Sequence, residues 1–217
     1  MFYSILQAMA LITLTTDLGT RDFFVAALKG AIITCNGFLP MVDVTHEIKA
    51  YDIKEAAYTV RNAYRYFPAG TIHIVHVNSS EAKGRLLITL IDGHYFITFD
   101  NGFISLAFEK TPHQTYQINE ELHDNGSLLH EGAIARVIEL LVKEYMPRDF
   151  GQLTTEAVNL RLLQPICSQG SIRGTIVHID HYGNAITNIS LKMFNDFIGN
   201  RRFTVLANVG QTRVISK

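Results

Sequence analysis

Residues Leu11 to Gly30 read LITLTTDLGTRDFFVAALKG, and this stretch decides how the fold begins. An apolar run of β-type residues ends in Asp17 and Gly19, and a helical pattern of apolar residues follows. This order predicts a strand, a turn and a helix, the repeating unit of open α/β sheets. Asp17 then falls at the carboxyl end of the strand, where such sheets bind their ligands.

Two acids in this stretch are candidates for ligand contacts. Asp22 lies near the expected start of the helix, where it could equally cap free N–H groups and complement the macrodipole. A carboxylate at Asp17 could accept hydrogen bonds from two vicinal hydroxyls, as acids do with ribose. The patterns G-x-G-x-x-G and G-x-x-x-x-G-K-[ST] do not occur, so neither standard dinucleotide nor triphosphate motif is present.

A second polar segment, IDHYGNAITNI, runs from Ile179 to Ile189. Gly183 and Asn184 between two apolar runs predict a hairpin turn. A hairpin alone does not explain why Asp180 and Tyr182 occur in the same segment. Donors, acceptors and an aromatic ring along one strand edge are suited to a polar, planar ligand.

The composition is that of an ordinary globular protein. The chain has 217 residues, 47% of them hydrophobic and 18% charged, with a net charge of -1. No basic stripe is present, which argues against nucleic-acid binding. Cys35 and Cys167 are far apart, which is typical of a reduced cytosolic protein. The nine histidines show neither H-x-x-x-H nor H-E-x-x-H spacing, which argues against a metal site.

The first residues are apolar but carry no basic segment before them. We therefore expect neither a signal peptide nor a membrane span, since the run is too short for the latter. We expect the true start at Met9.

The periodicity predicts two domains. Strands are expected at Leu11–Thr16, Met41–Thr45, Thr71–Val77, Leu86–Ile91 and Tyr95–Phe99, and helices at Asp22–Cys35, Asp52–Tyr66 and His130–Tyr145. Together these patterns predict an α/β layered domain at residues 9–150. Residues 151–168 contain Gly and Pro with little periodicity, which predicts a linker. Residues 169–217 are mostly β-type, apart from a short helical pattern, and predict a smaller β-domain.

Five segments, in this order, resemble the S-adenosyl-L-methionine hydroxide adenosyltransferases, relatives of the fluorinases and chlorinases. They are TTDLGTRD from Thr15, VDVTHEIKAYDIKEAA from Val42, FPAGTIHIVHV from Phe67, FDNG from Phe99 and IDHYGNAITNI from Ile179. The resemblance extends over Leu11 to Val209. It implies an N-terminal α/β layered domain and a C-terminal β-barrel domain. The family's barrel is longer than residues 169–217, so we expect a truncated barrel here.

The resemblance also implies an Asp-Arg-His trio that positions and activates water or hydroxide. The family motif D-P-G-V-G-x-x-R corresponds to NSSEAKGR, Asn78 to Arg85, so Asn78 replaces the acid while Arg85 keeps its spacing. The histidine corresponds to His130, in HEGA where the family has H-G-R-D. Asn can form hydrogen bonds but cannot accept a proton at neutral pH. From the residues alone, an Asx turn, a strand opening and a helix start would also explain these three positions.

The family's substrate contacts are carried over residue by residue. Asp17 is expected to bind the ribose hydroxyls, and Asp22 and Asp180 the methionine ammonium. Asn184 would hydrogen-bond the adenine edge, and Tyr182 would stack or pack beside it.

Tyr51 matches an aromatic position near the sugar and the sulfonium, where a cation–π contact is physically reasonable. Phe24 stands where the family commonly has Tyr or Ser, which removes a polar contact. Three further polar residues recur in the family's pattern, and we interpret them as structural: Asp43, His46 and Glu47.

These assignments predict hydrolysis of S-adenosyl-L-methionine to adenosine and L-methionine, by in-line attack of water or hydroxide at C5′. The substrate is the only small molecule implied; no metal, other cofactor, nucleic acid or membrane is expected. The resemblance implies a homotrimer whose pocket lies between one subunit's α/β domain and a neighbour's β-domain. The cytoplasmic location is expected from the cysteines.

Two other functions remain open. A non-catalytic protein that binds S-adenosyl-L-methionine or adenosine is favoured by Asn78 and by the altered residues after His130. A structural remnant that binds nothing is opposed by the intact segments around Asp17 and Asp180.

Overall fold

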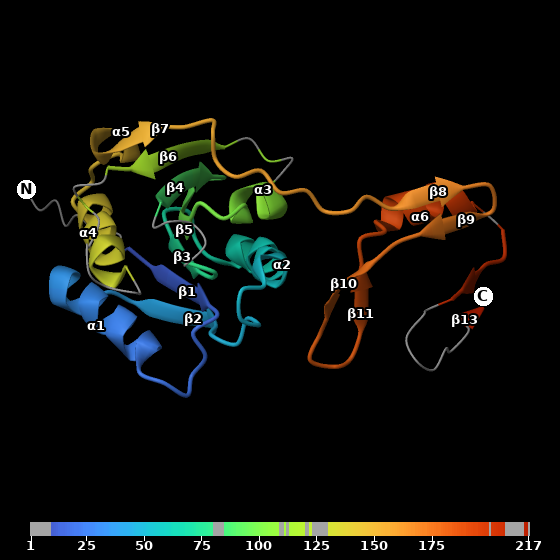
Figure 1. Ribbon diagram of the computed structural model, residues 1–217, viewed down its shortest axis with the longest axis horizontal. Coiled ribbons are helices and arrows are strands. Elements are labelled where there is room, and N and C mark those ends of the chain that lie inside the picture. Colours follow the sequence, from blue (N-terminus) through green and yellow to red (C-terminus); the bar gives the residue numbers. More distant parts are fainter. Residues whose placement is uncertain are drawn as a thin grey trace, which may run out of the picture. The chain divides into compact units, whose positions relative to one another are not determined.

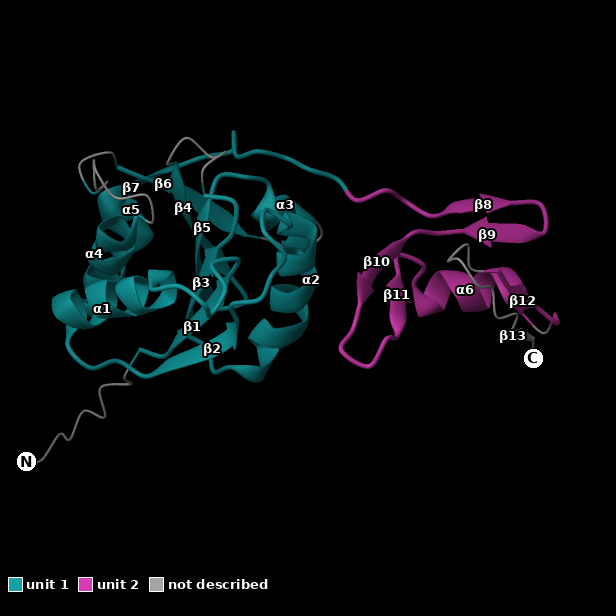
Figure 2. Cartoon of the chain, turned by 60° about the horizontal axis from the view of Figure 1, so that its bottom comes forward, with its two compact units in different colours: residues 1–161 teal, residues 162–217 magenta. Residues whose placement is uncertain are grey.

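The structure is a computed structural model with two compact units, Met1–Arg161 and Leu162–Lys217 (Figure 2). The residues that it describes are 10–79, 85–108, 111, 113–119, 122, 130–199, 201–206 and 215–216.

A mixed sheet forms the centre of the first unit and has seven strands in the described part of the chain (Figure 1). The strands are β1 Ile12–Thr16, β2 Met41–Thr45, β3 Ile72–His76, β4 Leu86–Ile91, β5 His94–Phe99, β6 Gln114–Ile118 and β7 Gly151–Leu153. Their order is β2-β1-β3-β5-β4-β6-β7. The first four of this order are parallel, and β4 is antiparallel to both β5 and β6. The carboxyl ends of β1, β2, β3 and β5 therefore meet at one edge.

Helices cover both faces of this sheet: α1 and α4 one face, α2 and α3 the other (Figure 1). The helices are α1 Phe24–Asn36, α2 Ile53–Ala63, η1 Tyr64–Tyr66, α3 Phe103–Phe108, α4 Glu131–Val142 and α5 Pro147–Phe150. Asp52 begins α2, because its side chain accepts the N–H groups of Lys54 and Glu55. Of the helices that the structure describes, none combines the length and the apolar composition that a membrane span requires.

The two faces of the sheet differ chemically because successive side chains on a strand point to opposite sides. Towards α1 and α4 the strands place Ile12, Leu14, Ile72, Ile74 and Ile97 in one apolar core with helix residues. The alternate positions bury polar side chains on the other face: Thr13, Thr15, His73, Thr89 and Thr98. The first face is a simple hydrophobic core, whereas the second needs internal hydrogen bonds.

Two histidines satisfy one another on this polar face. The Thr13 hydroxyl lies 2.7 Å from His73 Nδ1, and His73 Nε2 lies 3.1 Å from His94 Nδ1. The ring of Tyr64 meets His94 edge-on, and its hydroxyl donates to Asp92 at 2.8 Å. Burial, reinforced by the neighbouring His94, lowers the pKa of His73 to about 3. Both rings are therefore neutral near pH 7.

The segment after β7 is irregular but attached to the first unit. Val158 N–H donates to Asp100 Oδ1 at 2.7 Å, and Leu160 N–H donates to Ser105 Oγ at 2.9 Å. The Leu160 side chain also covers Gly102, where an added Cβ would lie 2.4 Å from Leu160 Cγ. A side chain at Gly102 would therefore displace this segment.

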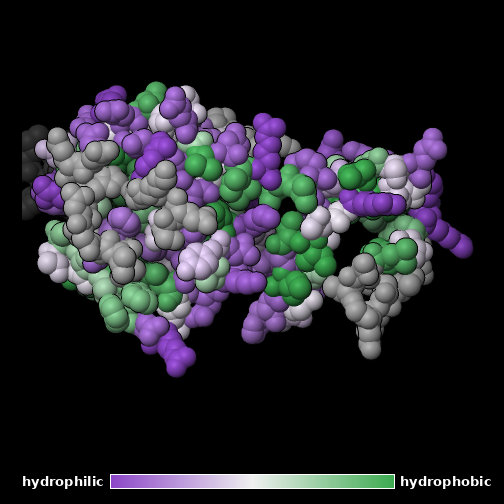
Figure 3. Space-filling model, viewed as in Figure 1, coloured by the Kyte–Doolittle hydropathy of each residue, from purple (hydrophilic) through white to green (hydrophobic). Residues whose placement is uncertain are grey.

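The second unit consists of short antiparallel pairs and one helix. The pairs are β8 Ile166–Ser168 with β9 Ser171–Arg173, β10 Ile176–Ile179 with β11 Ala185–Thr187, and β12 Thr204–Val205 with β13 Ile215–Ser216; the helix is α6 Leu191–Ile198. None of residues 162–199 and 201–206 is buried. Hydrophobic side chains gather at the surface over β10 and β11 (Figure 3), where Ile179 is 60% exposed. The closed barrel implied by the resemblance stays a prediction.

The predicted α/β class is confirmed, with strands and helices near the predicted positions. The sequence analysis did not predict α3, β6 or β7. The last of these strands pairs with β6 at the edge of the main sheet, and it lies within residues 151–168.

The neutral His73 predicts that the protein loses stability in mild acid. Its pKa is about 3 when folded against an ordinary 6.5, so the unfolded chain binds the extra proton between these values. Stability from this residue is complete above pH 6.5 and falls as pH drops towards 3, by up to about 1.4 kcal/mol per pH unit. Urea unfolding at a series of pH values measures the slope.

The matched variants are His73→Gln, which removes the titrating ring, and His113→Gln, which removes an exposed one. His73→Gln should reduce the loss of unfolding free energy as the pH falls from 6.5 towards 3, and His113→Gln should not. An unchanged slope in His73→Gln would show that another group causes the acid sensitivity.

Candidate functional site

Asp17 connects the loops that follow three neighbouring strands. It comes directly after β1, and its Oδ2 accepts the N–H of Tyr51 at 2.9 Å and the N–H of Asn78 at 3.2 Å. Tyr51 lies in the loop between β2 and α2, and Asn78 follows β3. Among the described residues, Asp17 Oδ1 accepts no hydrogen bond. One oxygen thus fixes the loops, and the other remains for a ligand.

Backbone strain collects at three of the residues predicted from the sequence. Tyr51, Asn78 and His130 have φ angles of 67°, 48° and 51°. They are three of the five described non-glycine residues with positive φ. A left-handed conformation costs about 1–2 kcal/mol in L-residues, and such strain tends to occur at functional sites. For Tyr51 and Asn78, the bonds to Asp17 offset part of this cost.

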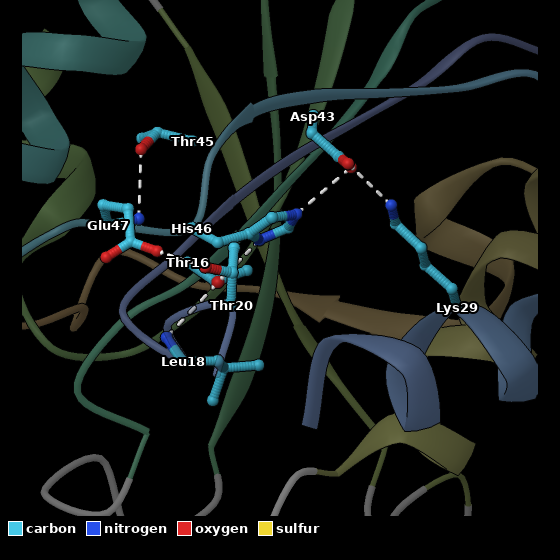
Figure 4. Close-up of polar contacts among 8 residues, drawn as sticks. All are labelled: Thr16, Leu18, Thr20, Lys29, Asp43, Thr45, His46 and Glu47. Carbon is cyan, nitrogen blue, oxygen red and sulfur yellow. Dashed lines mark hydrogen bonds and ion pairs between the residues drawn. The ribbon is translucent and has the colours of Figure 1, made fainter. Parts of the chain in front are cut away.

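A buried histidine supports the loop that carries Asp17 (Figure 4). His46 Nδ1 lies 2.9 Å from the Thr16 hydroxyl, and His46 Nε2 lies 3.2 Å from Asp43 Oδ1. Asp43 also pairs with Lys29 at 2.7 Å. Desolvation acts to raise the pKa of Asp43, but Lys29 and His46 outweigh it and hold that pKa below its usual value.

Further bonds join the loops after β1 and β2 (Figure 4). The Thr20 hydroxyl donates to Glu47 Oε1 at 2.8 Å, as Figure 4 shows. Gly19 N–H also donates to the His46 carbonyl at 2.8 Å. These contacts support the structural interpretation of Asp43, His46 and Glu47.

Asp22 does not cap the helix that follows it. Phe23 is the N-cap of α1, and no side chain bonds to the free N–H groups there. Asp22 is exposed one residue earlier. The helix-cap alternative is therefore wrong for this residue, and its carboxylate is accessible to a ligand.

Each member of the predicted catalytic trio borders the carboxyl ends of β3 and β5. Asn78 is buried two residues after β3. Arg85 opens β4, with Nη1 3.0 Å from Asp100 Oδ2 and Nη2 donating to Gln117 Oε1 at 2.8 Å. His130 precedes α4, and its ring lies 5.3 Å from the ring of Phe99. Residues 80–84 of the motif lie outside the described residues.

The FDNG segment joins these three positions. Phe99 contacts the His130 ring, Asp100 pairs with Arg85, and Asn101 Nδ2 donates at 2.7 Å to the carbonyl of Val77, next to Asn78. Asp100 is a buried acid to which the sequence analysis assigned no role. Its signal was an acid placed directly after a buried strand, within a segment that matched the family.

In the second unit, Asp180 organises the hairpin between β10 and β11. Its Oδ1 accepts the N–H groups of Tyr182 at 2.9 Å and Asn184 at 2.8 Å, and its Oδ2 accepts Asn184 Nδ2 at 2.8 Å. The side-chain bond from Asn184 is the main reason that the pKa of Asp180 is lowered. Tyr182 is 87% exposed at the tip. Asp180 and Asn184 thus have turn-forming roles, and the Tyr182 ring is presented to solvent.

A cavity of about 460 Å³ opens beside Tyr51. Its wall includes the start of α2, Leu106 of α3 and three cationic side chains: Lys49, Lys54 and Arg161. Because the Tyr51 N–H binds Asp17, the cavity and the free Asp17 oxygen belong to the same region of the first unit. The described residues hold no group of three or more His, Cys, Asp or Glu that could bind a metal.

Comparison with known sequences identifies the family. Residues 12–139 match the profile of the SAM hydroxide adenosyltransferase N-terminal domain, and residues 174–217 match that of the C-terminal domain. The chain belongs to the SAM hydroxide adenosyltransferase family. The resemblance seen in the five sequence segments is thereby confirmed.

Named relatives include both hydrolases and a halogenating enzyme. An (R)-S-adenosyl-L-methionine hydrolase of Methanocaldococcus jannaschii is 30% identical over 188 residues, which span 82% of this chain and 66% of that protein. A fluorinase of an Actinoplanes species is 22% identical over 212 residues, spanning 82% of this chain and 71% of the relative.

A solved structure has the same fold. An uncharacterized conserved protein from Thermotoga maritima superposes with a TM-score of 0.77 at 22% identity, over 95% of this chain and 80% of that one. At this identity the likeness concerns the fold.

The geometry predicts different structural roles for the two acids near β1. Asp17→Ala should lower the free energy of unfolding by about 1–3 kcal/mol, because two strained loops lose their shared acceptor. Asp22→Ala should change it by less than about 0.5 kcal/mol, because Asp22 is exposed and caps nothing. Urea unfolding of both variants and of Asp17→Asn, which keeps one acceptor oxygen, measures the difference. Equal stability of all variants would contradict the role of Asp17 in holding the loops.

Proposed function

We propose that this protein hydrolyses S-adenosyl-L-methionine to adenosine and L-methionine. The observation that supports this most is Asp17, with one oxygen engaged by Tyr51 and Asn78 and the other available at a strand-end edge. A carboxylate in that position suits the two hydroxyls of a ribose. Family members named as S-adenosyl-L-methionine hydrolases and a fluorinase indicate which ribose compound to expect.

The first unit would contact the sugar and the methionine part. Asp17 would accept from the ribose hydroxyls, and exposed Asp22 would pair with the ammonium group. The Tyr51 ring, 67% exposed, is accessible for a cation–π contact with the sulfonium.

The hairpin of the second unit would contact the adenine. Asn184 would hydrogen-bond the base edge through its carbonyl oxygen or its second amide N–H, since one N–H of its Nδ2 donates to Asp180. Tyr182 would stack beside the ring, and Asp180 would offer its remaining acceptor sites to the ammonium.

We propose that these contacts are made within a homotrimer, where the hairpin of one subunit completes the site of its neighbour. The second unit has no buried residue among those described, which favours an additional partner surface. Light scattering of the purified protein should give a trimer mass. A monomer that turns over substrate would exclude a site shared between subunits.

The reaction needs a positioned nucleophile more than an acid. As the water oxygen bonds to C5′, the C5′–S electron pair stays on sulfur, methionine leaves uncharged, and one proton is released. Orientation of the reactants can supply roughly 7–11 kcal/mol in favourable cases. A guanidinium and an amide do not accept a proton, so among the trio the imidazole of His130 is the side chain that can act as a base. Asn78 would orient the water.

A second candidate function is non-catalytic binding of S-adenosyl-L-methionine or adenosine. Asn78 favours it, because the family's hydrolytic motif has an acid there. Binding without turnover would decide for this alternative.

The substrate class is tested by calorimetry with S-adenosyl-L-methionine, adenosine and NAD. We expect the first two to bind, and Asp17→Ala to weaken both because the ribose loses its acceptor. Asp22→Ala should weaken binding of S-adenosyl-L-methionine alone, since adenosine has no ammonium. Binding of NAD but of neither adenosyl compound would refute the proposal.

The role of Asn78 is tested by adenosine release, followed by chromatography. Asn78→Asp should raise the rate, since a carboxylate near Arg85 and His130 can assist proton removal, an effect typically worth roughly 10²–10⁴-fold. Arg85→Ala should lower the rate. Equal rates in wild type and both variants would show that these residues do not act together. Binding of S-adenosyl-L-methionine without release of adenosine would establish the non-catalytic binding function.

A further inference from the structure

We propose that Asp100 is a positioning residue that holds Arg85 in the catalytic arrangement, through a carboxylate that Asn78 does not supply. This inference rests on the proposed hydrolysis and adds an acid to it. The acid comes from the end of β5 rather than from the loop after β3.

The contacts between the two residues involve both side chain and backbone. Asp100 Oδ2 lies 3.0 Å from Arg85 Nη1, and Asp100 N–H donates to the Arg85 carbonyl at 2.9 Å. The Asp100 side chain is 2% exposed, whereas that of Arg85 is 40% exposed. The guanidinium is therefore anchored from the protein side and remains accessible from the solvent side.

The burial of Asp100 makes this anchor strong. An isolated buried carboxylate costs several kcal/mol, and that cost is offset when the charge is paired and hydrogen-bonded. Arg85 provides the charge, and the N–H of Val158 donates to Asp100 Oδ1 at 2.7 Å. Asp100 Oδ1 is thus hydrogen-bonded, and Oδ2 lies beside Arg85 in an ion pair without hydrogen-bond geometry.

The surroundings place this pair among the trio residues. The preceding Phe99 packs against the rings of His76 and His130, at 5.1 Å and 5.3 Å. The following Asn101 bonds to the carbonyl of Val77, which precedes Asn78. A displacement of Asp100 would therefore also move Arg85. A displacement of the neighbouring Phe99 or Asn101 would move His130 or the backbone beside Asn78.

A double-mutant cycle separates positioning from general structural support. Asp100→Asn should lower kcat for adenosine release on the order of 10²-fold, because small displacements of a catalytic group can have that effect. It should change KM little. With Asn78→Asp present, the same substitution should cost less than about threefold, since the new carboxylate can hold Arg85.

The matched control is Asp92→Asn, which removes another Asp–Arg pair, at 3.1 Å from Arg65. Asp92→Asn should leave kcat unchanged. That result would show that the loss of kcat in Asp100→Asn is not a general consequence of removing an Asp–Arg ion pair. If Asp100→Asn lowered kcat by the same factor in the wild type and in the Asn78→Asp variant, the proposal would be overturned. That result would show that Asp100 supports the fold alone.

A readout without turnover keeps the inference separate from the proposed function. The guanidinium N–H protons of Arg85, followed by ¹⁵N-resolved NMR, should exchange faster with solvent in Asp100→Asn, and the exchange should slow again when Asn78→Asp is added. If the wild type releases no adenosine, hydrolysis fails while these signals still decide the anchoring of Arg85. Unchanged Arg85 signals in folded Asp100→Asn would refute it.

Discussion

The acceptance of two backbone N–H groups by one oxygen of Asp17 is the contact on which the site depends. It holds the loops after β2 and β3 against the end of β1, and it does so at two residues with left-handed backbones. A charged acceptor forms stronger hydrogen bonds than a neutral one, so the carboxylate can retain conformations that Tyr51 would otherwise avoid. The fold positions the loops, and this acid joins them through one oxygen, while its other oxygen accepts no hydrogen bond from the described residues.

The two faces of the sheet in the first unit are stabilised by different interactions. The face under α1 and α4 is an ordinary apolar core, which stabilises without directional bonds. The face under α2 and α3 buries threonines and histidines that must satisfy one another, so its geometry is more narrowly determined. The strand ends that carry Asp17, Asn78 and Asp100 therefore begin from strands fixed on both sides. The pH sensitivity expected of His73 is a cost of that polar face.

The sequence was sufficient for those features that depend on local pattern. The strand before Asp17, the helix after Asp52 and the turn at Gly183 follow from periodicity and turn chemistry, and the structure has them. The role of Asp100 was missed although a local signal for it existed. Its pairing with Arg85 follows from the hairpin of β4 and β5, whose two-residue turn Asp92-Gly93 is typical of such hairpins and places residue 85 beside residue 100. For Asp22 the local pattern misled in a different way. Its residue type suggested a helix cap, but Phe23 occupies the N-cap position of α1.

The expected replacement of an acid by Asn78 is compatible with what this residue does for the backbone. Asp17 binds its N–H rather than its side chain, and its φ of 48° lies in a region that Asn and Asp both tolerate better than other residues. The two side chains also have nearly the same size and shape. Exchange between them is therefore compatible with the same loop conformation and changes the charge, the proton affinity and the side-chain N–H donors. The fold does not require an acid at this position. In the proposed hydrolysis an acid would serve the chemistry, for which we propose Asp100 as the support of Arg85 and His130 as the proton acceptor.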